Sequence, residues 1–319
     1  MVIHMETHEI LRGLREDRDL TQQNMADVLK NLRKFVLQYK PDVVVPFMTY
    51  QCIYTCLALA FTKYPVVVCE RNDPSKIDGR DANKLHYFLR DLAFSMAKGA
   101  IFQTEGAKKY FSGSIQKKST VILNPLNSAS FIEAYEGEKE NRIVSVGRLT
   151  EQKNQAMLIK AFAQIKNEFP DVVLEIYGDG DKKDYLNQLS IDLDVSDRVF
   201  LMGNVSDVNE RIKKARVFAF TSDFEGMPNA LAEAMSVGLT CVSTDCSPGG
   251  ARMLIQDGVN GIITPCRDVD LFADALRKVL SDDQYALSLG RAALNIRESL
   301  CLSNIADHWE EYLSMVAQK

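Results

Sequence analysis

The sequence has 319 residues, of which 46% are hydrophobic and 25% charged, and its formal net charge is −5. This composition is typical of a globular protein of about two domains, and no apolar run is long enough to cross a bilayer as a helix. Four histidines and seven scattered cysteines without a CxxC pair argue against a zinc site and are typical of reduced, buried thiols in a cytoplasmic protein.

Residues 1–125 alternate between helical and extended patterns. This alternation predicts an α/β domain with a parallel sheet and helices on both faces. The apolar spacing predicts helices over 21–39, 50–63, 81–98 and 105–111, and strands over 43–45, 65–69, 100–104 and 120–123. Four strands make a partial Rossmann-like domain, so either a preceding segment is missing or another chain supplies it. An open sheet edge of this kind favours self-association.

Residues 126–141 are polar and rich in Glu, Lys and Gly, which predicts a linker to a second domain over 142–300. Six strand–helix units predict that this second domain is a complete doubly wound sheet. The expected strands are 143–146, 172–177, 199–202, 217–221, 240–243 and 261–264, and the expected helices are 155–168, 181–193, 205–215, 228–237, 249–255 and 268–280. Helices over 283–300 and 303–317 close the chain, the second within the closing segment 301–319, where His308 and Trp309 are expected to pack rather than to catalyse.

One stretch joins a buried strand to an Ala/Leu-rich helix, namely Phe224-Glu225-Gly226-Met227-Pro228-Asn229-Ala230. Gly226 permits a tight turn, and Pro228 suits the first position of a helix. The unpaired N–H groups of that turn form a site for an anion, best suited to phosphate. Glu225 and Glu233 flank the turn with carboxylates that can accept hydroxyl hydrogens. Phosphate beside two such carboxylates suggests a nucleotide sugar.

Another strand end carries Gly147, Arg148 and Lys153 just before a predicted helix. Gly147 allows close approach of a ligand to the backbone, and the two cations fall at the carboxyl edge of the sheet, where open α/β sheets bind ligands. Arginine offers a fork of donors to phosphate oxygens, and lysine offers a point charge. The alternative is that both are surface cations that cap loops.

Further strand ends carry weaker signals. Asp179 and Asp181 fit a DxD metal motif, but they fit equally well a glycine turn in which Asp181 caps the next helix. Asn204 follows a strand and could face a flat base. The turn 247–250 either contacts a sugar or only reverses the chain. In the first domain, the segment 70–73 follows a strand, so Glu70 and Arg71 either contact an acceptor or form a structural ion pair.

These motifs together resemble glycosyltransferase family 4 over about residues 40–300. The resemblance rests on Gly147-Arg148-Leu149 with Lys153, on the E-x7-E spacing of Glu225 and Glu233, and on Pro228-Asn229. The family consists of retaining enzymes with the GT-B fold, in which two Rossmann-like domains face each other. The segment 70–74 is similar to members that build bacterial surface polysaccharides and glycans on lipid carriers.

The resemblance implies a role for each matching residue. Arg148 and Lys153 would bind the donor diphosphate and stabilise the leaving group, and Glu225 would contact the transferred sugar. Glu233 would bind the ribose hydroxyls, while the backbone from Met227 to Ala230 would cradle phosphate. Neither a metal nor another cofactor is expected, because cations and helix N–H groups do that electrostatic work.

The sequence therefore predicts a retaining hexosyltransferase that moves a sugar from a UDP-sugar to a glycan or lipid-linked acceptor. The family also begins with a strand and a Gly-rich loop that this sequence lacks. A rival interpretation is thus a nucleotide-sugar-binding subunit that is inactive without a partner, and a nucleotide-sugar epimerase is a third.

We expect a cytoplasmic protein with no nucleic-acid partner. Residues 1–125 are net positive, which favours peripheral contact with the inner membrane face or reflects ordinary surface variation.

Overall fold

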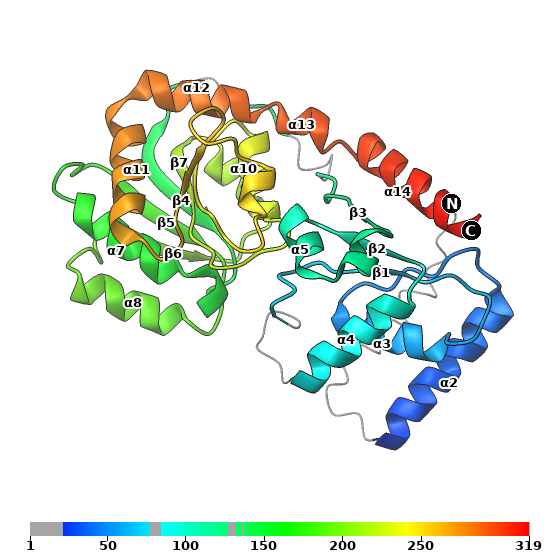
Figure 1. Cartoon of the computed structure of the whole chain (residues 1–319). Helices are drawn as coiled ribbons and strands as arrows, with labels where there is room; N and C mark the ends of the chain where they lie inside the picture. The colour runs from blue at the N-terminus through cyan, green and yellow to red at the C-terminus, as the bar shows by residue number, and fades with distance from the viewer. Residues whose placement is uncertain (1–21, 77–83, 127–131, 136, 319) are drawn as a thin grey trace. The chain divides into compact units, whose positions relative to one another are not determined.

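The computed structural model describes residues 22–76, 84–126, 132–135 and 137–318, which divide into two compact units (Figure 1). The smaller unit comprises the described parts of Met1–Phe102, Lys108–Val121 and Trp309–Lys319. The larger unit comprises Gln103–Ala107 and the described parts of Ile122–His308. Two short segments that follow strands of the smaller unit, at residues 103–107 and 122–126, are thus counted with the larger one.

The smaller unit contains a parallel sheet whose strand order is β1-β2-β3. Its strands are β1 (Val67–Cys69), β2 (Gly99–Phe102) and β3 (Ser119–Val121). Its helices are α2 (Gln22–Tyr39), α3 (Thr49–Ala58), α4 (Lys84–Met96), α5 (Glu105–Tyr110) and α6 (Gly113–Gln116). The first turn of α5 is counted with the larger unit. Every residue of β1 and β2 is buried, as expected for a parallel sheet covered on both faces. Residues 81–83 of the predicted helix 81–98 lie outside the described residues.

The strand predicted over 43–45 does not form as a regular strand. Single bridges pair Val44 with Val66 and Phe47 with Cys69, both parallel to β1. Between these bridges lie Val45 and Pro46, and Pro46 has no N–H to donate and contributes only its carbonyl, to Cys69 N. The proline therefore interrupts the ladder, and the described sheet has three regular strands instead of the four predicted.

The larger unit is a six-stranded parallel sheet with the order β6-β5-β4-β7-β8-β9. Its strands are β4 (Glu140–Val146), β5 (Val173–Tyr177), β6 (Val199–Gly203), β7 (Ala215–Phe220), β8 (Thr240–Thr244) and β9 (Ile262–Thr264). From β4 the chain adds strands outward on one side and then returns to add β7, β8 and β9 on the other. The switch point, where ligands of doubly wound sheets bind, therefore lies between the adjacent strands β4 and β7.

Helices cover this sheet in two groups. The helix α7 (Gln155–Ile165) neighbours both α8 (Lys183–Asp192) and α11 (Val269–Ser281) (Figure 1). The helix α10 (Asn229–Ser236) neighbours α9 (Val208–Ile212), α12 (Asp283–Ala293) and α13 (Ile296–Ser299). The core under α7 and α11 joins Phe162 and Phe272 to Ile143, Leu174 and Ile176 of the sheet, all fully buried. This packing fixes the strand ends from which the site loops emerge.

Several predicted boundaries differ from the structure, three of them by more than a shortened end. Most of the helix predicted over 249–255 is replaced by a short 3-10 helix, Ala251–Met253, and the one predicted over 283–300 breaks into α12 and α13. The strand β4 begins at Glu140, inside the predicted linker 126–141, because Glu140 N bonds to Lys214 O beside β7. Residues 127–131 and 136 of that linker lie outside the described residues.

The last helix, α14 (Leu302–Ala317), begins in the larger unit and ends in the smaller one. The hydroxyl of Tyr312 accepts from Ala100 N (3.0 Å) and donates to Lys118 O (2.5 Å), which holds the helix on the amino ends of β2 and β3. Trp309 lies 5.9 Å from the ring of Phe47, a packing contact. Within the part of the chain that is described, no helix is both long enough and apolar enough to span a membrane.

Candidate donor site

The loop after β4 carries Arg148 at the switch point. Gly147 N donates to Tyr177 O (2.9 Å), and the buried Leu149 donates from its N–H to Asp179 O (3.0 Å). These bonds bring the loop so near β5 that a Cβ on Gly178 would lie 2.0 Å from Gly147 O. The backbone is thus anchored on both sides of Arg148, whose own side chain is exposed.

Two of the predicted residues, Lys153 and Glu225, form an ion pair. The distance from Lys153 Nζ to Glu225 Oε1 is 2.5 Å, and the side chains are 17% and 13% exposed. Gln152 Nε2 also donates to Glu225 Oε1 (3.2 Å) and to Phe224 O (2.8 Å), and Ser222 Oγ donates to the same carboxylate (3.3 Å). Glu225 therefore holds Lys153 close to the turn that begins α10.

The helix α10 begins at Asn229, one residue later than predicted, with Pro228 at the capping position. The N–H of Met227 donates to Gln103 Oε1 (3.1 Å) and so is already engaged. The first helical hydrogen bond of α10 runs from Ala232 N to Pro228 O (3.1 Å), so the N–H groups of Asn229 and Ala230 belong to the unpaired first turn of the helix. Those two N–H groups are the ones placed to bind an anion.

Glu233 lies one turn into α10 and is half-buried. Burial raises the pKa of its carboxyl group. A carboxyl group in this setting can accept or donate hydrogen bonds to hydroxyl groups of a ligand.

A pocket of about 190 Å³ opens at the carboxyl ends of β4, β5 and β6. It brings together three predicted residues, Gly147, Arg148 and Asn204, but Lys153, Glu225 and Glu233 are not among its lining residues. The lining comprises Val146, Gly147, Arg148, Tyr177, Gly178, Gly203, Asn204, Val205 and Val208. Three of these lining residues are valines, so the pocket is partly apolar.

The loop after β8 supports the loop after β7. Ser247 O accepts from Glu225 N (2.7 Å), and a Cβ on Gly250 would lie 2.1 Å from Gly226 O. This close approach requires a glycine at position 250. This support is a role that the sequence did not suggest, and sugar contact by residues 247–250 stays a prediction.

Several residues of the site were missed by sequence reasoning. Gln103 and Asn124 contact the start of α10, and Asp223 accepts from Asn154 Nδ2 (3.0 Å) and from Arg267 (2.7 Å). The available signal was position for Asn124, which follows the predicted strand 120–123 as Arg148 follows 143–146, whereas Gln103 lay inside the predicted strand 100–104 and follows β2 only because that strand ends at Phe102.

Asp179 and Asp181 are exposed, and Asp179 Oδ1 accepts from Gly180 N (2.9 Å), which is the geometry of a turn. Among the described residues, no group of three or more His, Cys, Asp or Glu side chains is arranged to hold a metal ion.

In the smaller unit, Glu70 is committed to its own turn. It is 2% exposed and accepts from Thr49 Oγ1 (2.9 Å), Arg71 N (3.1 Å) and Asn72 N (3.3 Å). Burial raises the pKa of Glu70 to about 7. The guanidinium of Arg71 lies 5.4 Å from the centre of the Phe47 ring, and burial lowers its pKa. Contact of either predicted acceptor-side residue with an acceptor stays a prediction.

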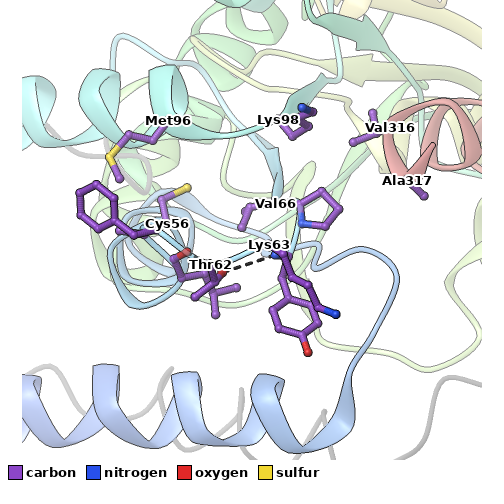
Figure 2. Close-up of a pocket in the computed structure, with 13 residues that line it drawn as sticks. Cys56, Thr62, Lys63, Val66, Met96, Lys98, Val316 and Ala317 are labelled. Carbon is purple, nitrogen blue, oxygen red and sulfur yellow. Dashed lines mark hydrogen bonds between the residues drawn. The ribbon is translucent and has the colours of Figure 1, made fainter. Parts of the chain in front are cut away.

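A larger pocket, of about 410 Å³, lies at the other edge of the same sheet (Figure 2). Its lining residues include Val66 and Lys98, which precede β1 and β2, and Val316 of α14. Glu70 and Arg71 follow the carboxyl end of β1, so this pocket does not belong to the predicted acceptor side.

The sequence family and the relatives that match this chain are described as glycosyltransferases. Residues 129–295 match the sequence family described as "Glycosyl transferases group 1". The chain is 27% identical to the Campylobacter jejuni GalNAc-alpha-(1->4)-GalNAc-alpha-(1->3)-diNAcBac-PP-undecaprenol alpha-1,4-N-acetyl-D-galactosaminyltransferase, over 89% of this chain and 78% of that protein. It is 32% identical to an uncharacterized glycosyltransferase of Methanocaldococcus jannaschii, over 70% of this chain and 60% of the relative.

Solved structures show the same fold. Anabaena HepE in complex with UDP superposes with a TM-score of 0.81 at 19% identity, over 91% of this chain and 82% of that one. Staphylococcus aureus TarM, in complex with UDP among other ligands, gives 0.74 at 18% identity, over 90% of this chain and 59% of that one. The chain therefore spans about three fifths of TarM and of the M. jannaschii relative. The predicted GT-B architecture is confirmed.

Proposed function

Because this chain belongs to the group 1 glycosyltransferases, we propose that it transfers a sugar from a nucleotide diphosphate sugar, most simply a UDP-sugar, to a lipid-linked glycan. We further propose that the new bond keeps the anomeric configuration of the donor, as in family 4. The observation that carries the donor assignment is the pairing of Lys153 with Glu225 beside the unpaired first turn of α10.

Each part of a nucleotide sugar has a matching part of the site. The pocket at the ends of β4, β5 and β6 would take the base, with Asn204 at its rim. Arg148, Lys153 and the N–H groups of Asn229 and Ala230 would bind the diphosphate. Glu225 would accept from hydroxyl groups of the transferred sugar, and Glu233 from those of the ribose.

The chemistry asks the protein to stabilise the departing diphosphate. The bond from the sugar C1 to the diphosphate oxygen breaks, and negative charge grows on the diphosphate. The acceptor hydroxyl attacks C1 from the same face and passes its proton to the departing diphosphate oxygen. Arg148, Lys153 and the first turn of α10 supply positive charge and N–H donors where that charge develops. We propose that these groups suffice and that no metal ion or other cofactor takes part.

The acceptor assignment rests on relatives. The C. jejuni relative is named for an acceptor carried on PP-undecaprenol, and an Escherichia coli relative for one carried on diphosphoundecaprenol. By analogy, we propose a lipid-linked acceptor in surface polysaccharide synthesis, reached from the cytoplasmic face of a membrane, with Arg71 on the acceptor side.

Binding and turnover of the donor test the proposal together. Calorimetry with UDP should give saturable binding to the wild-type chain, and Arg148→Ala should weaken it. A radiolabelled UDP-sugar should be consumed in the presence of an undecaprenol-linked acceptor. Absence of UDP binding would contradict the donor assignment, whereas binding without turnover would favour the rival role as a donor-binding subunit.

A further inference from the structure

Two side chains remote in sequence hold the turn that begins α10. Gln103 is 3% exposed; its Oε1 accepts from Met227 N (3.1 Å) and its Nε2 donates to Asn124 Oδ1 (2.9 Å). Asn124 Nδ2 then donates to Asn229 Oδ1 (2.9 Å). This series of three hydrogen bonds, here called the Gln103 network, begins and ends on residues that flank Pro228.

Each amide in the network has a fixed orientation. Gln103 faces a donor with its oxygen and an acceptor with its nitrogen, so turning the amide over would lose both bonds. Met227 is buried, and its N–H requires an acceptor, which Gln103 supplies. The network therefore fixes the plane of the Gly226–Met227 peptide and the side chain of Asn229.

The same turn is also enclosed by backbone. A Cβ on Gly106 would lie 2.1 Å from Pro248 O, and one on Gly250 would lie 2.1 Å from Gly226 O. Residues 224–229 are therefore packed against residues 247–250, which are packed in turn against the segment that begins with Gln103. A turn held this closely does not have to be ordered when a ligand binds.

From this geometry we propose that Gln103 and Asn124 are positioning residues for the donor diphosphate. They set the direction of the Asn229 and Ala230 N–H groups and touch no part of the ligand themselves. The inference rests on the proposed donor site and adds two residues that follow β2 and β3, outside the motifs of the family resemblance.

The test is the variant Gln103→Leu, which keeps a side chain of similar size and removes both of its hydrogen bonds. We expect about a tenfold weaker affinity for UDP, because a misdirected first turn loses charge-assisted bonds to phosphate. Affinity for uridine, which lacks the diphosphate, should stay unchanged.

Thr240→Val is the matched control, because it deletes another buried hydrogen bond, from Thr240 Oγ1 to Ala286 O (2.6 Å), at the amino end of β8. It should lower the melting temperature without changing UDP affinity.

Asn124→Ala keeps the proposal testable if Gln103→Leu fails to fold, since the Asn124 side chain is only partly buried. We expect about threefold weaker UDP binding, and adding Asn229→Ala should weaken it no further, because Asn124→Ala has already removed the bond from Asn124 Nδ2 to Asn229 Oδ1. The inference is overturned if the folded variants bind UDP as the wild type does. It is also overturned if their affinities for uridine and for UDP fall by the same factor. A wild-type chain that fails to bind UDP would instead contradict the proposed function.

Discussion

The two sheets use buried polar side chains in different ways. At the carboxyl edge of the larger sheet, Lys153 and Glu225 form an ion pair beside the first turn of α10, whose N–H groups have no partner within the helix. At the carboxyl edge of the smaller sheet, both carboxylate oxygens of Glu70 accept hydrogen bonds, one from Thr49 of α3 and the other from Arg71 N and Asn72 N of its own turn. A polar residue at a strand end is therefore evidence for a ligand only after its internal partners have been counted.

The largest expected effect tests the larger sheet. Lys153→Ala removes a cation from the proposed leaving-group site and should lower kcat/KM for sugar transfer by ~10²–10³, as for loss of one donor to a developing anion. Steady-state kinetics with the labelled UDP-sugar would measure it. Lys182→Ala is the control, because Lys182 pairs with the exposed Glu151 and should have no kinetic effect. Equal rates for both variants would remove the contrast between the two sheets.

The next effect tests the smaller sheet through the pH dependence of stability that Glu70 causes. The folded protein holds the Glu70 proton up to a pKa of about 7, whereas the ordinary value is 4.5. The folded state thus binds more protons between these values, so this contribution to stability is present below about 4.5 and is lost as pH rises through 7. Over that range it amounts to ~3 kcal/mol.

Glu70→Gln should remove this pH dependence while still bonding to Thr49 and the turn. We expect the melting temperature of the variant, relative to the wild type, to rise between pH 5 and pH 8. Calorimetric UDP affinity should not change, because Glu70 acts within its own turn. If the melting temperatures of both proteins changed in parallel with pH, the pKa of Glu70 would not be raised in the folded state.

The smallest effect tests how the last helix is attached to the smaller sheet. Tyr312→Phe deletes the hydroxyl that bonds to Ala100 N and Lys118 O, at a cost of about 1–2 kcal/mol in unfolding free energy. Urea denaturation would measure the loss, with Tyr185→Phe, an exposed tyrosine, as the control. Equal stability of both variants would mean that the packing of α14 does not need this hydroxyl.

Local patterns in the sequence were enough to predict most elements. Continuous apolar runs predicted all six strands of the larger sheet within a few residues, since central strands such as β7 and β8 are buried almost throughout. The prediction was wrong where a single residue acted through its backbone, as when Pro46 interrupted the strand predicted over 43–45. The motif around Glu225 was also apparent, because a strand, a glycine turn and a helix start are adjacent in the chain.

The sequence by itself determined the fold class, the family resemblance and the loops where the site lies, because these depend on residues a few positions apart. The tertiary structure alone decided which side chains meet: Lys153 with Glu225, Gln103 with Met227 N, and Glu70 with Thr49. These partners are separated by tens of residues or more, and the packing of whole strands and helices brings them within hydrogen-bonding distance. No local periodicity encodes that choice.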